Sequence, residues 1–375
     1  MEMDFFATAA KGVEEVLAAE IKSLGVQAVT LEKGGVRFKG DMKDCYRANL
    51  WLRTAHRVLV TVAEFACETP QQLYDGVRAI SWQQYLTPDL TLAVSCNLRD
   101  SKITHSGFAA LKAKDAIVDS LRDSCGRRPN VDSRSPDLQV NLHLVRNYCT
   151  VSLDSSGSSL DKRGYRLDRK EAPLRESLAA AIIDLSGWDG NVPLVDPMCG
   201  SGTIPVEAAL KASRRAPGLT RAGFGFQRWM SFDPETWSVV LKEAQEQVEE
   251  TLSVPILGSD LSVGALDVAR KNADRAGVGN LVTFSRAGIG EGVSPASPGI
   301  LLCNPPYGIR LGDEEALRIL YKKLGDTLKK FYSGYTAFVL CGNPSLASCI
   351  GLRPARRIVL FNGAIECRLL RYELY

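Results

Sequence analysis

The sequence predicts an α/β domain of alternating strands and helices that follows an α+β region. Three observations favour this class. Its 375 residues are too many for one ordinary domain. After Leu174, short apolar runs alternate with helical patterns, which is typical of a parallel sheet with crossover helices. The chain ends in two strand-like runs joined by Asn362-Gly363, a strong hairpin signal.

The N-terminal half mixes strands and helices without that alternation. A long helix is expected from an N-cap at Ser106 to Cys125, with Gly126 as its stop. Ser155 to Ser159 has the composition of a linker, and we place a domain boundary there. The other expected helices are 11–24, 42–49 and 73–80, and the expected strands are 36–38, 58–62, 90–97, 140–145 and 149–153.

The C-terminal half follows the strand–helix order closely. Pro173 is expected at the first position of a helix that runs to Leu185. The expected strands are 192–196, 255–257, 300–303, 336–340, 357–361 and 364–372, and the other expected helices are 203 onward, 263–276 and 314–332.

Composition excludes several classes of protein. There is no run of eighteen apolar residues, so no membrane span is expected, and the first residues do not resemble a secretory signal. The ten cysteines form no Cys-x-x-Cys pair and only three histidines accompany them, so we expect no metal site and reduced thiols in a cytoplasmic protein.

Positive charge is concentrated locally although the net charge is only +3. Residues 99–170 hold fourteen Lys or Arg against nine Asp or Glu, and residues 211–230 hold five cations and no acid. Such local excesses bind phosphate backbones, although solvated helix faces and loops would look the same.

The first motif, Asp196-Pro197-Met198-Cys199-Gly200-Ser201-Gly202-Thr203, lies between an expected strand and an expected helix. Glycines there let a ligand approach the backbone, and the ends of parallel strands are where open sheets bind ligands. The motif is neither a dinucleotide fingerprint nor a phosphate-binding P-loop. A tight connection is the alternative, but we favour a cofactor site.

The second motif places Asp260 and Leu261 at the end of the next strand. An acid here can accept hydrogen bonds from ribose hydroxyls, or it can cap the next helix. Asp260 follows Asp196 by 64 positions, so an insertion must intervene. Within it, we expect Arg214, Arg215, Arg221 and Arg228 to contact RNA phosphates, and the aromatics Phe224, Phe226 and Trp229 more readily to form core than to stack on bases.

The third motif, Asn304-Pro305-Pro306-Tyr307, follows an apolar strand. The Asn304 side-chain carbonyl and the Pro305 backbone carbonyl can accept both N–H bonds of an exocyclic amine on a base and orient it toward a methyl donor. The two prolines fix the backbone, and Tyr307 can stack on the base. A rigid, purely structural loop is the alternative.

Together these motifs resemble class I S-adenosylmethionine-dependent methyltransferases that modify N6 of adenine or N2 of guanine. Residues 101–103, 108–119, 126–129 and 153–157 look like a THUMP RNA-binding domain, and 162–166 with 172–176 resemble the connection found in bacterial 23S ribosomal RNA guanine-N2 methyltransferases. The resemblance implies a ferredoxin-like region (1–60), a THUMP domain (61–157) and a Rossmann-like methyltransferase domain with a mixed seven-stranded sheet (158–375).

The resemblance further implies S-adenosylmethionine as cofactor and RNA as partner, with guanine N2 in 23S ribosomal RNA as the target. The base must leave its stack to reach Asn304. The expected cofactor-binding residues are Ala172, Pro173, Leu174, Asp196, Pro197, Met198, Cys199, Gly200, Gly202, Thr203, Asp260, Leu261 and Asn304. The expected RNA-binding residues are Lys102, Lys112, Lys114, Arg127, Arg128, Arg163, Arg166, Arg221 and Arg228.

One position departs from the family pattern. Such enzymes carry an acid that holds the adenine amino group of the cofactor, four residues beyond an aromatic here identified as Phe284, but this chain has Gly288. Glu291 is the expected substitute. Three alternatives stay open: a transfer RNA guanine-N2 methyltransferase, an enzyme acting on DNA adenine or protein glutamine, and a non-catalytic RNA-binding assembly factor.

Overall fold

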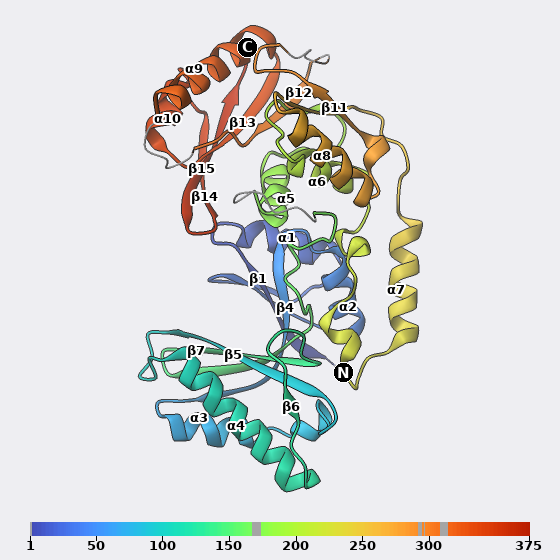
Figure 1. Cartoon of the computed structure of the whole chain (residues 1–375), viewed down its shortest axis with the longest axis vertical. Helices are drawn as coiled ribbons and strands as arrows, with labels where there is room; N and C mark the ends of the chain where they lie inside the picture. The colour runs from blue at the N-terminus through green and yellow to red at the C-terminus, as the bar shows by residue number, and fades with distance from the viewer. Residues whose placement is uncertain (1, 167–173, 292–294, 296, 308–313) are drawn as a thin grey trace.

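Two mixed β-sheets organise the chain (Figure 1). The computed structural model describes residues 2–166, 174–291, 295, 297–307 and 314–375. No helix in these ranges is both long and apolar enough to cross a membrane.

The first sheet has eight strands in the order β2-β3-β1-β4-β8-β7-β5-β6. Its strands are β1 (Met3–Ala9), β2 (Val29–Glu32), β3 (Gly35–Gly40), β4 (Ala55–Ala66), β5 (Thr91–Arg99), β6 (Asn130–Val131), β7 (Leu138–Val145) and β8 (Tyr148–Asp154). Its helices are α1 (Glu14–Ser23), α2 (Met42–Trp51), α3 (Pro70–Arg78), the 3-10 turn η1 (Trp82–Gln84) and α4 (Ser106–Cys125).

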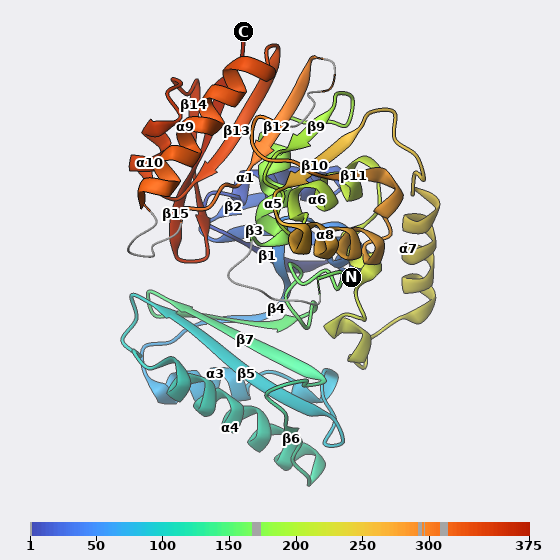
Figure 2. The ribbon, with the colours of Figure 1, turned by 45° about the horizontal axis from the view of Figure 1, so that its top comes forward.

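The long strand β4 joins the two N-terminal regions into this one sheet. Residues 55–60 of β4 pair with β1 and residues 59–66 pair with β8, so the expected division between residues 60 and 61 falls inside a strand. Beyond β8, the sheet continues through β7 and β5, whose apolar side chains pack on α3 and α4. Figures 1 and 2 show these two helices on one side of β5 and β7 and the rest of the molecule on the other side.

The second sheet confirms the predicted Rossmann-like domain with seven strands and a terminal antiparallel hairpin (Figure 2). Its order is β11-β10-β9-β12-β13-β15-β14, and the first five strands are parallel. The strands are β9 (Leu194–Asp196), β10 (Ile256–Asp260), β11 (Val282–Arg286), β12 (Gly299–Cys303), β13 (Tyr335–Cys341), β14 (Arg356–Asn362) and β15 (Ile365–Glu373). The helices are α5 (Glu176–Leu185), α6 (Thr203–Ala212), α7 (Pro234–Glu246), α8 (Val263–Arg275), α9 (Glu314–Phe331) and α10 (Pro344–Cys349), with 3-10 turns η2 (Pro217–Thr220), η3 (Gly225–Arg228) and η4 (Gly279–Leu281).

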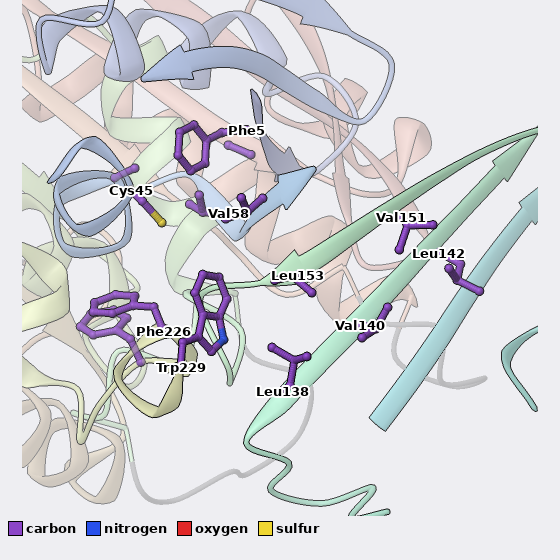
Figure 3. Close-up of a cluster of buried hydrophobic side chains, with 14 of the residues drawn as sticks. Phe5, Cys45, Val58, Leu138, Val140, Leu142, Val151, Leu153, Phe226 and Trp229 are labelled. Atoms are coloured by element: carbon purple, nitrogen blue, oxygen red, sulfur yellow. The ribbon is translucent and has the colours of Figure 1, made fainter. Parts of the chain in front are cut away.

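The predicted insertion between β9 and β10 packs on the N-terminal region. Phe224, Phe226 and Trp229 are buried, and the Phe226 ring lies 4.5 Å from that of Tyr46 on α2. Figure 3 shows Phe226 and Trp229 in the same core as residues of the first sheet. The prediction that these aromatics form core is therefore confirmed, because apolar area this large is most stable when it is removed from water.

A buried ion pair fixes the connection between the two sheets. The Arg163 guanidinium, only 1% exposed, pairs with Glu207 of α6 and donates to the backbone carbonyls of Arg53 and Leu160. The Tyr165 hydroxyl donates to the same Glu207 oxygen at 3.0 Å. A buried charge is tolerated only when it is paired and hydrogen-bonded, so this cluster ties residues 160–165 to α6.

Several local expectations need correction. Ser155 and Ser156 are buried rather than part of an exposed linker, because their hydroxyls bond Asn49 and the Val58 backbone. His105, whose Nδ1 accepts from the Phe108 amide, is the N-cap of α4 in place of Ser106. Helix α5 begins at Glu176, and the expected first position, Pro173, lies outside the described residues. In the last hairpin Asn362 still pairs with Ile365, so the turn is Gly363-Ala364.

Replacing Glu207 tests the buried ion pair. Glu207→Ala leaves the Arg163 charge buried without a counter-ion, and we expect the free energy of unfolding to fall by about 3–5 kcal/mol. Urea denaturation followed by circular dichroism measures this. The control Glu246→Ala removes an exposed partner of Lys242 on α7 and should change stability by less than about 1 kcal/mol. Equal effects of the two substitutions would contradict the role given to Glu207.

Candidate active site

The glycine turn after β9 forms the floor of the candidate site. Gly200 and Gly202 have φ of +53° and +80°, a region that favours glycine. A Cβ at Gly202 would lie 2.9 Å from the Ala269 Cβ and 3.0 Å from the Phe284 ring, so no larger residue fits. A Cβ at Gly200 would meet no atom within 4 Å, so the space beside this backbone is open.

Asp260, at the end of β10, holds this turn in place. One carboxylate oxygen accepts from the Gly200 amide at 3.0 Å and the other from the Ser262 amide at 2.8 Å. Ser262 rather than Asp260 caps α8, since its hydroxyl accepts from the Ala265 amide. The capping alternative for Asp260 is therefore wrong, and a role toward ribose hydroxyls stays a prediction.

Asn304 and the glycine turn share one pocket of about 140 Å³. Its lining includes Asp196, Met198, Gly200, Thr203 and Asn304. The Asn304 Oδ1 atom is buried and has no hydrogen-bond partner among the described residues. Because a buried acceptor without a partner is costly, this atom is suited to accept an N–H from a bound molecule.

Asp196 gives the pocket an uncompensated acid. The carboxyl group is buried at the end of β9, where one oxygen accepts from the Met198 amide at 3.1 Å. No Lys or Arg pairs with it within the described ranges. Burial, together with the nearby Asp260 charge, raises the pKa of Asp196 to about 8. A cationic ligand bound here would favour the ionised form.

These features fit S-adenosylmethionine, which is cationic at its sulfonium and carries hydroxyl and amino donors. The glycine turn would admit it closely, and the unpaired Asn304 Oδ1 atom and the Asp196 carboxyl group, which line the same pocket, would face its donors or those of the substrate. The site therefore has the open backbone and free acceptor that such a cofactor requires, together with a buried acid that a bound cation would ionise.

Tyr307 packs against the terminal hairpin. Its hydroxyl accepts from the Asn362 Nδ2 at 2.9 Å, and a Cβ at Gly342 would lie 2.6 Å from its ring. Burial raises the pKa of Tyr307 to about 12, so the phenol is neutral at physiological pH. The sequence gives no sign that Asn362 holds Tyr307, because the two residues lie 55 positions apart. The only local signal at Asn362 is its place near the hairpin turn.

Arg166 belongs to the candidate site and not to an exposed surface, which corrects its expected role toward RNA. Its guanidinium donates to the Leu174 carbonyl at 3.2 Å and to the Thr203 hydroxyl, and it pairs with Glu176 at 3.7 Å. It thus positions Leu174 and Thr203, which line the pocket. The other two expected cofactor residues of this segment, Ala172 and Pro173, lie outside the described residues.

Glu291 occupies the space beside Gly288. Its carboxylate accepts from the Gly288 amide at 2.9 Å, and a Cβ at Gly288 would lie 3.0 Å from the same oxygen. The side chain of Leu261, 63% exposed, lies 3.2 Å from that Cβ position. The Glu291 carboxylate therefore occupies the space that the side chain of a larger residue at position 288 would enter. The exposed apolar side chain of Leu261 lies next to it.

The remaining expected RNA-binding residues of the THUMP domain form two groups, one that lines a hollow and one whose members form ion pairs with acids. Lys112, Lys114 and Arg128 line one hollow of about 510 Å³ beside α4. Lys102 and Arg127 are exposed but pair with Glu68 and Asp89.

Arg163 and Arg221 require correction as RNA ligands. Arg163 is buried in the ion pair with Glu207. Arg221 directs both terminal nitrogens at oxygens of Ser156, Ser158, Ser159 and Lys162. Desolvation lowers the pKa of Arg221 to about 10.

The cysteines near the site have no catalytic arrangement. Cys199 and Cys303 are free and buried, and desolvation raises the pKa of both thiols well above the ordinary value. Only a thiolate is a good nucleophile, so both act as small apolar side chains. Within the described ranges, no cluster of three His, Cys, Asp or Glu side chains could hold a metal ion.

The raised pKa of Asp196 predicts a pH dependence. In the unfolded chain this carboxyl group titrates near its ordinary value of 3.8 and in the folded protein near 8, so the folded state binds the proton more tightly. Asp196 therefore stabilises the fold most below about pH 4, and this contribution is lost as pH rises toward 8. Asp196→Asn, which keeps the acceptor for Met198, should lessen this decline.

Urea denaturation between pH 4 and pH 8, without added cofactor, measures the difference between the two proteins. One group contributes at most about 1.4 kcal/mol per pH unit. The control is Asp189→Asn, which replaces an exposed acid in the loop between α5 and β9. Parallel pH profiles for wild type and Asp196→Asn would show that the carboxyl group is ionised throughout.

Family models match three consecutive parts of the chain. They describe an RlmL ferredoxin-like domain (residues 4–59), a THUMP domain (67–154) and an RMKL-like methyltransferase domain (163–371). A putative RNA methyltransferase from Synechocystis sp. is 42% identical over 99% of this chain and 97% of its own length. A ribosomal RNA large subunit methyltransferase K/L from Syntrophotalea carbinolica is 46% identical, and this chain spans 53% of its length.

A solved structure extends the similarity to a cofactor. A putative methyltransferase complexed with SAH (S-adenosylhomocysteine) superimposes with a TM-score of 0.91 at 33% identity, over 100% of this chain and 98% of that one. The predicted combination of a ferredoxin-like region, a THUMP domain and a class I methyltransferase domain is thereby confirmed. The chain belongs to the RMKL-like family of S-adenosylmethionine-dependent methyltransferases.

Proposed function

We propose that this protein transfers a methyl group to N2 of a guanine in RNA, and that the RNA is 23S ribosomal RNA. The observation that carries the proposal is the buried, unpaired Asn304 Oδ1 atom in the same pocket as the glycine turn. The names of the curated relatives support RNA as the substrate, and one names the large ribosomal subunit. This chain spans about half the length of that relative, so the activity of the whole relative comes to this chain only as part of the proposal.

The chain's own residues would contribute to the reaction by orienting the amine of the base toward the methyl donor. S-adenosylmethionine supplies an activated methyl group when it is bound. The exocyclic amine of guanine is a weak nucleophile because its lone pair is delocalised into the ring. Asn304 Oδ1 would accept one N–H and the Pro305 carbonyl the other, which would hold the nitrogen in line for displacement. Pro305 is buried and Pro306 exposed, so the loop is anchored on one side only.

Tyr307 would form one wall of the base pocket. Its hydroxyl is held by Asn362 and its ring lies on Gly342, so its position is fixed before any base enters. Preorganised aromatic surfaces suit a base that has left its stack. The division of work would follow the predicted regions, with 1–60 and 61–157 holding RNA and 158–375 carrying out the transfer.

Asn304→Ala tests the catalytic assignment. Loss of one preorganised hydrogen-bonding group at a reacting centre costs about 10²–10³ in kcat, and we expect a fall of this size. The binding of S-adenosylhomocysteine, measured by calorimetry, should weaken far less. Asn280→Ala, which removes an exposed amide from a loop remote from β12, is the matched control.

The substrate is tested in a strain that lacks the gene. Site-resolved nucleoside mass spectrometry should show one N2-methylguanosine missing from 23S ribosomal RNA, and the wild-type gene but not Asn304→Ala should restore it. Methylation confined to transfer RNA, or to adenine, would overturn the proposed substrate. Failure to bind the cofactor at millimolar concentration would overturn catalysis itself.

Glu291 is proposed as the group that recognises the adenine amino group of the cofactor, in place of a side chain at Gly288. Leu261 would then cover one face of the adenine ring. A hydrogen bond to a charged acceptor contributes about 1.5 kcal/mol or more, so Glu291→Ala should weaken S-adenosylhomocysteine binding about tenfold. Calorimetry with S-inosylhomocysteine, which lacks the amino group, adds a second measurement.

Wild type should prefer the adenosyl over the inosyl compound, and Glu291→Ala should lose this preference. Glu315→Ala, an exposed acid in the first turn of α9, is the control. A preference that survives in Glu291→Ala would assign the adenine contact to another residue.

A further inference from the structure

A hollow of about 850 Å³ lies between the THUMP domain and the insertion that follows β9. The proposed catalytic mechanism uses none of the residues that line it. One side is the face of β5 and β7 that α3 and α4 leave uncovered. The other side consists of the segment 157–162 and the insertion loop 222–228. We call this hollow the sheet groove. Its volume is at the upper end of small-ligand pockets, which span roughly 300–1,000 Å³.

The floor of the sheet groove is polar but uncharged. Ser95 and Asn97 on β5 and Gln139 and Asn141 on β7 share this face, and Ser95 is paired with Asn141 in the parallel register. The alternate residues, among them Leu138, Val140 and Leu142, point to the opposite face and are fully or almost fully buried.

The amides on this floor retain hydrogen-bonding capacity. The side-chain amides of Asn141 and Gln139 donate to the Ser95 hydroxyl at 3.3 Å, and Gln139 also donates to the Val140 carbonyl at 3.1 Å, but the side-chain oxygens of both residues accept no hydrogen bond from the described residues. The side-chain amide of Asn97, which is exposed, has no hydrogen-bond partner within the described ranges. A row of amides and hydroxyls can both donate to and accept from a ligand that presents mixed edges, as nucleobases do.

The rim of the sheet groove is cationic. Arg134, Lys162 and Arg228 are exposed, and none of them pairs with a carboxylate within the described ranges. The two acids of the lining are already engaged. Asp154 pairs with Arg57 and accepts from the Ser156 amide, and Asp137 accepts from the Thr91 amide and hydroxyl. Because the lining holds the four cations Arg57, Arg134, Lys162 and Arg228 against these two acids, the net charge that a ligand meets is positive.

The wall formed by the insertion is anchored rigidly. The Phe226 amide donates to the Ser155 carbonyl at 2.9 Å. A Cβ at Gly225 would lie 2.8 Å from both the Asp154 carbonyl and the Gly157 amide nitrogen, so only glycine permits this approach. Arg221 closes the same junction through its bonds to the segment 156–162. The sheet groove is thus a built feature shared by the THUMP domain and the methyltransferase domain.

We propose that the sheet groove binds a single-stranded segment of the RNA substrate, with phosphates on the rim cations and base edges on the floor amides. The inference rests on the proposed function for the identity of the substrate. A duplex would present phosphates to the rim, but the Watson–Crick edges of its bases are paired inside the helix, so the floor side chains could not read them as they could read the edges of unpaired bases. The groove would hold RNA by a second set of contacts, separate from the Asn304 pocket.

The proposal is tested by fluorescence anisotropy with the full chain, without cofactor, using a labelled unstructured 12-nucleotide RNA and a hairpin of the same composition. Arg134→Ala/Lys162→Ala should lower affinity for the single strand and reduce the slope of log Kd against log salt by about 0.7 for each phosphate that the variant no longer neutralises. Asn97→Ala/Asn141→Ala should lower affinity at least threefold and leave that slope unchanged.

Two matched controls lie outside the sheet groove. Lys322→Ala removes an exposed cation from α9, and Asn280→Ala removes an exposed amide. Both should bind RNA as wild type does. Circular dichroism and binding of S-adenosylhomocysteine show that each groove variant is folded, because the cofactor site lies in another part of the molecule.

Wild-type affinity in both groove variants would overturn the proposal, and so would equal weakening of single-strand and hairpin binding by Asn97→Ala/Asn141→Ala. The binding measurement needs neither cofactor nor methyl transfer. If the methylated nucleoside proves different from N2-methylguanosine, the groove result therefore stands independently, and a negative groove result leaves the catalytic assignment intact.

Discussion

The placement of the catalytic domain depends on the buried ion pair between Arg163 and Glu207. Arg163 lies in the segment between the two sheets, yet its guanidinium reaches Glu207 in α6 and the backbone carbonyl of Arg53. Arg53 reciprocates by donating to the carbonyls of Leu210 and Arg215 at 2.9 Å. Removing two guanidinium groups from water is unfavourable unless all these acceptors are in place, so the arrangement stabilises one docked geometry against others.

The same segment continues into the candidate active site. Three residues after Arg163, Arg166 contacts the Leu174 carbonyl and the Thr203 hydroxyl, both at the pocket. A second route runs through the terminal hairpin, where Lys11 lies over the Phe361 ring at 4.4 Å and Asn362 holds Tyr307. The N-terminal region is thus connected by direct contacts to both sides of the site, the cofactor side and the Asn304 loop.

Much of this architecture could be predicted because its causes are local in the sequence. Gly200 and Gly202 adopt backbone conformations that few other residues tolerate, and Arg146-Asn147, between the expected strands 140–145 and 149–153, turns the chain with φ of +52° and +61°. Asp260 and Asn304 follow apolar strands whose ends must meet at one edge of a parallel sheet. For these residues, neighbours within a few positions determine the structure.

What could not be predicted depends on partners far along the chain. An arginine has no pattern that reveals burial, and Arg163 and Arg221 find partners 44 and about 60 positions away. Likewise, the serines at 155 and 156 look like a linker because serine is small and polar, but their hydroxyls are consumed by Asn49, more than 100 positions earlier. Side-chain identity alone does not tell a satisfied buried polar group from a solvated one.

The cationic stretches therefore have two different roles. The excess of Lys and Arg between residues 99 and 170 favours RNA binding, but part of that charge serves internal docking through Arg163 and Arg166. Cations that have no carboxylate partner in the described ranges, such as Arg134 and Lys162, gather where an uncharged polar sheet face meets the insertion. Phosphate attraction alone carries no sequence information, whereas amides beside it can distinguish bases. Under the proposed function, affinity and selection of RNA would therefore reside in the N-terminal half, and the Asn304 loop would need only to recognise the base presented to it.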